Sequence, residues 1–177
     1  MTHSMKSDLI AIVALIVTIA LFFGQGCVTR NDCNGMWTYN AKDWNSEEIQ
    51  RMNDAVSKIN DWAGSEIVFI HAALPHEVDQ DRCVINRVTQ LTHDDTKADG
   101  LCQPLSGNLS IDMQGIKNNY ENPLDRLEIT FAHELLHGMG FAHVTDRGNV
   151  MHPKGMNGDL VFGEQDSSQC VELGYCQ

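Results

Sequence analysis

The sequence predicts an α+β fold, and three observations lead to this prediction. Apolar residues recur at three- and four-residue steps after Asn45, which is typical of an amphipathic helix. Short apolar or alternating runs follow at residues 66–70, 83–88 and 108–113, and they have the length of strands. A second helical pattern begins at Pro123. Helices on either side of a group of strands predict one domain in which helices pack on a sheet.

The first predicted helix begins after Asn45, because Glu48 stands three residues later and completes a capping-box pattern. Gly64 follows the last apolar position and is expected to end the helix. The residues expected to face the core are Ile49, Met52, Val56, Ile59 and Ala63.

Three segments are predicted to be strands. Residues 66–70 are apolar enough to be a buried strand, and residues 83–88 are a second strand candidate. Between them and the third segment, residues 89–106 are polar and contain Gly and Pro, which predicts a loop. Residues 108–113 alternate between polar and apolar side chains, so we expect a strand there, placed at an edge of the sheet.

The second helix is expected to start at Asn122 and Pro123, since proline is favoured in the first helical turn. Its buried stripe is predicted to consist of Leu124, Leu127, Phe131 and Leu135. A further amphipathic stretch at residues 163–175 predicts a closing helix.

The most informative motif lies on the second helix. Residues 133–143 read H-E-x-x-H-x-x-G-x-x-H, a zinc-binding signature. His133 and His137 are four residues apart, so a helix places both imidazoles on one face, where they can bind one Zn²⁺. Gly140 allows the chain to leave the helix, and the turn is expected to bring His143 back as the third ligand. Three protein ligands leave the fourth position open, which is typical of a catalytic zinc.

Glu134 follows the first histidine and points about 100° around the helix, so it is not expected to be a ligand. It is placed to act as general base toward a metal-activated water. The predicted site therefore has one catalytic residue, Glu134, and three metal ligands, His133, His137 and His143.

The signature and the residues after it resemble the metzincin metallopeptidases. Met151, followed by His152 and Pro153, is similar to the methionine turn that lies beneath the zinc in that family. Together with the closing helix, these residues look most like matrixins, although matrixins usually have Tyr where this chain has His152. We expect a structural or solvent-facing role for His152.

The resemblance implies a metzincin-type zincin fold. In that fold a small twisted mixed sheet packs on an N-terminal helix, the zinc-site helix, the methionine turn and a C-terminal helix. An antiparallel edge strand lies over the active site and pairs with an extended substrate. We assign residues 108–113 to that edge strand.

The function implied is that of a zinc-dependent endopeptidase, which hydrolyses peptide bonds of proteins or peptides. One alternative is a catalytically inactive zinc-binding module on the same scaffold, and a second is a membrane-tethered structural protein. The presence of Glu134 argues against the first alternative, and the complete signature argues against the second. We expect a monomer that acts on a protein or peptide substrate.

The first 26 residues are not expected to belong to the domain. Lys6 precedes an uncharged apolar run at residues 9–23, and a small-x-small pattern ends at Gly26. This predicts a secretory signal peptide or, if it is retained, an N-terminal membrane anchor that associates through residues 9–24. Lipidation at Cys27 is a third alternative. In each case the domain of residues 27–177 is exported, as a secreted, periplasmic or membrane-anchored protein.

Six cysteines and an export segment indicate disulfide bonds in an oxidising compartment. If the last helix continues through Cys176, Cys170 and Cys176 lie about 9 Å apart along its axis, too far to bridge. Cys83 and Cys102 would then form a local pair, and Cys33 would link the N-terminal arm to the closing helix. Six cysteines allow 15 pairings, so the connectivity stays open.

The formal net charge of −12 excludes a nucleic-acid partner, which requires a basic surface. Two polar stretches contain potential ligands for additional structural Zn²⁺ or Ca²⁺. The spacing of these ligands matches no known metal site, so we expect both stretches to be solvent-exposed loops. These residues are His71, His76, Asp79, Asp81, His93, Asp94, Asp95 and Asp99.

Overall fold

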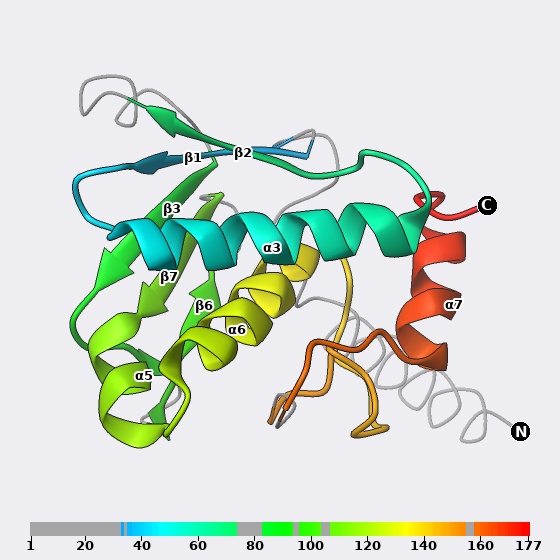
Figure 1. Ribbon diagram of the computed structural model, residues 1–177. Helices are drawn as coiled ribbons and strands as arrows, with labels where there is room; N and C mark the ends of the chain where they lie inside the picture. The colour runs from blue at the N-terminus through cyan, green and yellow to red at the C-terminus, as the bar shows by residue number, and fades with distance from the viewer. Residues whose placement is uncertain (1–32, 34, 74–82, 94–95, 104–106, 155–157) are drawn as a thin grey trace, which may run out of the picture.

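A computed structural model describes residues 33, 35–73, 83–93, 96–103, 107–154 and 158–177. Within these residues the chain combines four helices with a five-stranded sheet and a two-stranded hairpin (Figure 1). The predicted combination of helices with a mixed sheet is confirmed. The elements are β1 (Met36–Asn40), α3 (Ser46–Ala63), β2 (Phe69–Ala73), β3 (Val84–Val88), β4 (Thr92–His93), β5 (Thr96–Lys97), β6 (Gly100–Cys102), β7 (Asn108–Asp112), α5 (Met113–Asn119), α6 (Pro123–Gly138) and α7 (Glu164–Glu172).

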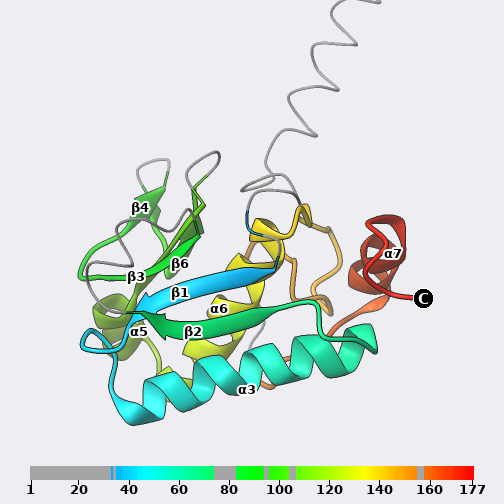
Figure 2. The ribbon, with the colours of Figure 1, turned by 90° about the horizontal axis from the view of Figure 1, so that it is seen from above.

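The large sheet is mostly parallel and has the strand order β2-β1-β3-β7-β6. Strands β2, β1, β3 and β7 are parallel, whereas β6 runs antiparallel to β7 and forms one edge. The helices α3 and α6 pack against each other, and α6 also contacts β6 and β7. Helix α7 stands apart from the sheet, beside the C-terminal end of α3 (Figures 1 and 2).

The assignment of residues 108–113 to the edge strand is wrong. They do form a strand, β7, but β7 lies between β3 and β6 and pairs with both. The edge strand is β6, inside the stretch of residues 89–106 that was predicted to be a loop. A segment of three residues is too short to show an alternating hydrophobic pattern, and Gly100 lowers its strand propensity further. Only the hydrogen bonds to β7 identify this segment as a strand.

The prediction for residues 66–70 is shifted, because β2 begins only at Phe69. The side chain of Asn60 in α3 accepts hydrogen bonds from the N–H groups of Ile67 and Val68 and donates one to the Val68 carbonyl. These backbone groups are therefore bound to the helix and not to a neighbouring strand. Strand β1 was not predicted, although it contributes the fully buried Trp37 to the core.

Helix α3 begins as predicted. Asn45 accepts a hydrogen bond from the Glu48 N–H (2.9 Å), and the Glu48 carboxylate accepts one from the Asn45 N–H (3.0 Å), which completes the capping box. The helix ends at Gly64, which has a φ of 71°. Met52, Ile59 and Ala63 are buried as expected.

Helix α6 runs through the centre of the core. Every residue from Leu127 to Gly138 is buried, so the helix has no solvent-facing side over its last three turns. Leu127, Phe131 and Leu135 form the predicted stripe, while Leu124 is only half-buried. Such a helix keeps polar side chains inside the protein only where they have partners or a function.

The predicted disulfide pairs are wrong. Cys33 bonds to Cys83, and Cys170 bonds to Cys176 across a Cα–Cα distance of 5.2 Å. The second pair forms because α7 ends at Glu172, so that the chain folds back and the Cys176 N–H donates to the Cys170 carbonyl. Cys102 is disulfide-bonded as well.

The predicted N-terminal export segment, the retained-anchor alternative and Cys27 all lie outside the described residues. Among the helices that the structure does describe, none has the length and apolar character needed to cross a membrane.

Candidate metal centre

Three imidazoles converge on one point. His133 and His137 lie one turn apart on α6, and the chain reverses at Gly140, whose φ of 98° is readily adopted only by glycine. This reversal brings His143 against the helix. The Nε2 atom of His143 lies 3.2 Å from Nε2 of His133 and 3.0 Å from Nε2 of His137. Among the described residues, these three form the only group of three or more His, Cys, Asp or Glu side chains placed to hold a metal ion.

Hydrogen bonds on the far side of two rings fix their tautomers. The Nδ1–H of His133 donates to the Val150 carbonyl (2.7 Å), and the Nδ1–H of His137 donates to the Phe141 carbonyl (2.8 Å). Since Nδ1 carries the proton in both rings, each Nε2 presents a lone pair to the shared point. Nitrogens about 2 Å from a tetrahedral zinc lie about 3.3 Å from one another, so the observed spacing fits Zn²⁺.

The environment keeps these rings neutral. Burial lowers the pKa of His133 from 6.5 to about 4 and that of His137 to about 3. The pKa of His143 is also lowered, first by partial desolvation of its ring and then by the charges of His152 and His93. A neutral imidazole is the form that binds a metal, so at pH 7 no proton has to leave before binding.

Glu134 is buried beside this group. Its Oε2 accepts a hydrogen bond from the Cys102 N–H in β6 (2.7 Å). A Cβ on Gly100 would lie only 2.7 Å from the Glu134 Cγ, so the absence of a side chain at Gly100 lets the edge strand approach the carboxylate. Burial raises the pKa of Glu134 to about 8, and the Cys102 hydrogen bond offsets part of that rise.

A cavity of about 690 Å³ lies over these groups, between β6 and α6. One end of the cavity is lined by an ion-paired cluster. Arg126 bonds Asp99 through Nε (2.8 Å) and Nη2 (2.6 Å), and the Tyr120 hydroxyl donates to the same Asp99 oxygen (2.7 Å). The cavity is therefore open toward the imidazoles and has a fixed polar wall at Arg126.

The segment at Met151 is held by a residue that the sequence did not indicate. Asp166, in the first turn of α7, is buried and accepts hydrogen bonds from the N–H groups of Val150 (2.8 Å), Met151 (3.2 Å) and Gly163 (3.0 Å). Met151 is fully buried. The sequence signal was weak, because an acidic residue in a first helical turn is ordinary capping chemistry.

His152 is buried, and its Nδ1 accepts a hydrogen bond from the Lys154 N–H (3.2 Å). This agrees with the structural role expected for it and not with a solvent-facing one. Of the other residues weighed as metal ligands, the three that the structure describes do not form a metal site. His71 lies in β2, His93 in β4, and Asp99 is bound to Arg126; the remaining ones, His76, Asp79, Asp81, Asp94 and Asp95, lie outside the described residues.

No family model matches the sequence, and no curated protein matches it. Among solved structures, the chain is similar to the crystal structure of archaemetzincin from Methanopyrus kandleri, with a TM-score of 0.57 and 13% sequence identity. The similarity covers 81% of this chain and 97% of the archaemetzincin chain. At this identity the comparison shows the fold alone: the described residues adopt an archaemetzincin-like fold, in which two histidines of the central helix and one of the loop after it converge.

Proposed function

We propose that this protein is a zinc-dependent endopeptidase in which His133, His137 and His143 hold one Zn²⁺ and Glu134 is the general base. The observation that carries the proposal is the convergence of the three Nε2 atoms beside a buried carboxylate. The archaemetzincin-like fold supports it, as does the sequence resemblance to metzincins. Met151 to Pro153 and the closing helix favour a matrixin-like member of that family.

The chemistry divides between the metal and the chain. When bound, Zn²⁺ would polarise the scissile carbonyl and acidify water. Glu134 holds the proton that the attacking water loses and passes it to the leaving amine. Because Cys102 occupies Oε2, this proton is held at Oε1.

Strand β6 supports a peptide as substrate. The Asp99 carbonyl and the Gln103 N–H face β7, since they bond to Asp112 and Asn108. Backbone groups alternate in direction along an antiparallel strand, so those of Gly100 and Cys102 face the opposite way, toward the α6 side. The Cys102 N–H already donates to Glu134, so an extended peptide would pair with the backbone groups of Gly100 on that outer edge while its scissile bond lies above the imidazoles.

Export of the protein also belongs to this proposal. The Cys33–Cys83 and Cys170–Cys176 disulfides are typical of an oxidising compartment, and the apolar segment before residue 27 would direct the chain there. We propose that the mature protein is a secreted, periplasmic or membrane-anchored monomer that acts on proteins or peptides. A catalytically inactive zinc module remains the alternative, but it would have no use for a buried carboxylate next to the imidazoles.

The test is hydrolysis of a quenched fluorescent peptide library. We expect cleavage by the zinc-loaded protein, loss of cleavage with a chelator and recovery on adding zinc. Glu134→Gln should lower kcat/KM by about 10²- to 10⁴-fold while one zinc per chain stays bound. Glu164→Gln, an exposed change on α7, is the control and should leave kcat/KM and the bound zinc unchanged. Full activity of a zinc-loaded Glu134→Gln protein would refute the general-base role.

A further inference from the structure

Helix α7 presents three polar side chains to the segment that follows α6. Gln165 accepts a hydrogen bond from the Asp146 N–H (3.1 Å), and Asp166 bonds the backbone around Met151. Gln169 reaches Ala142, the residue directly before His143. All three contacts are to backbone groups. They therefore constrain the path of the loop and do not depend on its side chains.

The contact of Gln169 is bidentate. Its Oε1 accepts a hydrogen bond from the Ala142 N–H (2.8 Å), and its Nε2 donates to the Ala142 carbonyl (3.0 Å). A planar amide that pairs with both groups of one residue fixes the peptide units on either side of it. The second of these peptide units leads directly into His143.

His143 needs such support more than the other two histidines do. His133 and His137 are held by a buried helix and by hydrogen bonds from Nδ1 to backbone carbonyls. His143 is exposed and lies on a loop, and among the described residues no hydrogen bond joins its Nδ1 to a protein acceptor. Its backbone is fixed from both sides instead: at Ala142 by Gln169, and at Val144, whose N–H donates to the Met151 carbonyl (3.1 Å).

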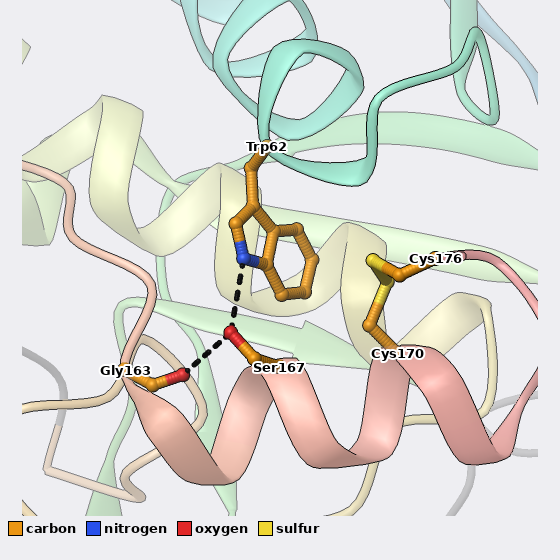
Figure 3. The surroundings of a disulfide bond; sticks show 5 residues. All are labelled: Trp62, Gly163, Ser167, Cys170 and Cys176. Carbon is orange, nitrogen blue, oxygen red and sulfur yellow. Dashed lines mark hydrogen bonds between the residues drawn. A yellow bond between two sulfur atoms is a disulfide. The ribbon is translucent and has the colours of Figure 1, made fainter.

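Helix α7 is itself anchored firmly enough to act as this support. Figure 3 shows the Trp62 N–H of α3 donating to the Ser167 hydroxyl (3.3 Å), which in turn donates to the Gly163 carbonyl (3.0 Å). The Cys170–Cys176 disulfide in the same view closes the turn after the helix. Trp62 also stacks on Phe162, with ring centroids 4.3 Å apart.

We propose that Gln169 is a positioning residue for the third metal ligand: by clamping the Ala142 backbone, it holds the His143 imidazole where the other two converge. This inference rests on the proposed zinc site. Removing the clamp leaves two ligands in place and lets the third leave its position, so zinc affinity should fall while the fold persists. Outer contacts that orient a metal ligand typically change affinity by 10- to 100-fold.

The experiment measures zinc affinity of the full chain by competition with a chromophoric chelator. Gln169→Ala removes both hydrogen bonds, and we expect zinc to bind about tenfold more weakly. Gln169→Glu has the same shape but no N–H for the Ala142 carbonyl, so it should also weaken zinc binding. If the alanine variant does not fold, the glutamate variant tests the positioning role in its place. Ser168→Ala is the control, because that hydroxyl bonds only within α7, to the Glu164 carbonyl.

Cobalt(II) provides a second readout that does not depend on activity. The visible spectrum of the cobalt-loaded protein reports coordination, and we expect it to change in both Gln169 variants but not in Ser168→Ala. If the unaltered protein binds zinc and folded Gln169 variants bind it equally tightly with the same cobalt spectrum, the positioning role is refuted. If the unaltered protein binds no zinc, the proposed function itself fails.

Discussion

Burial shifts the pKa values of three side chains of the candidate site away from their ordinary values. Burial keeps His133 and His137 neutral and favours the protonated form of Glu134. The neutral histidines prepare the site for a cation, since each offers a lone pair. The same pKa shifts make the free energy of unfolding of the metal-free protein depend on pH.

We predict that the metal-free protein is most stable near pH 6.5. The two histidines have lowered pKa values, so their contribution is complete above 6.5 and is lost as the pH falls toward 4. Glu134 has a raised pKa, so its contribution is complete below 4.5 and is lost as the pH rises toward 8. Above pH 6.5 only Glu134 acts; below it the two histidines outweigh Glu134, which gives a slope of up to about 1.4 kcal/mol per pH unit on each side.

Urea unfolding of chelator-treated protein between pH 5 and 8.5 measures this dependence. Glu134→Gln should abolish the loss of stability above pH 6.5 and steepen the loss below it, whereas Glu164→Gln should reproduce the original curve. A metal-free protein whose free energy of unfolding keeps rising from pH 6.5 to 8 would contradict the pKa assigned to Glu134.

At the scale of single elements, α6 is the most constrained part of the molecule. Its last three turns are buried on all sides, and its final residue, Gly138, lies against Trp37 of β1. A Cβ at Gly138 would lie 2.2 Å from Cζ2 and 2.5 Å from Cη2 of that fully buried indole. The helix can therefore approach the sheet only where a side chain is missing.

Gly138→Ala should consequently destabilise the protein, although alanine is the better helix former. We expect the free energy of unfolding to fall by about 1–3 kcal/mol, because the tryptophan or the helix must move to relieve the overlap. Gly148→Ala is a matched control, since its Cβ would come no closer than 3.7 Å to any neighbour, and it should change stability by less than about 0.5 kcal/mol. Denaturant titration of both variants provides the comparison, and equal midpoints would refute the argument.

The elements that the sequence predicted well are the long periodic ones. The capping box at Asn45 and the proline at the start of α6 are local signals, and each helix begins where its signal stands. Strand β6 and the backbone clamps made by Asp166 and Gln169 could not be found in this way. Each involves a contact outside its own segment: the Cys102 N–H of β6 bonds Glu134, 32 residues away, and Ala142 is held from 27 residues away.

At the scale of the whole molecule, two disulfides restrain the chain to very different extents. Cys33 and Cys83 are 50 residues apart and join the segment before β1 to the start of β3, whereas Cys170 and Cys176 are 6 residues apart and act only on the end of α7. Closing the longer loop removes more conformational entropy from the unfolded chain.

We predict that stability follows this order. The double variant Cys33→Ala/Cys83→Ala should lose about 4 kcal/mol of unfolding free energy, and Cys170→Ala/Cys176→Ala about 2 kcal/mol, by the loop-entropy relation. Guanidinium titration of both double variants tests the ranking. A larger loss for the short C-terminal loop would show that native contacts around Tyr175, and not loop entropy, determine the contribution of that disulfide.

The sequence alone determined which three histidines come together, because the spacing of His133 and His137 depends only on the helical repeat, and the turn at Gly140 lies within the same motif. It also determined that helices and a sheet would combine, since hydrophobic periodicity is a local property. The tertiary structure alone decided which strand borders the cavity, how the cysteines pair and what holds His143 in place. No local periodicity specifies those outcomes, and the free energy that selects them comes from burial and pairing across the whole fold.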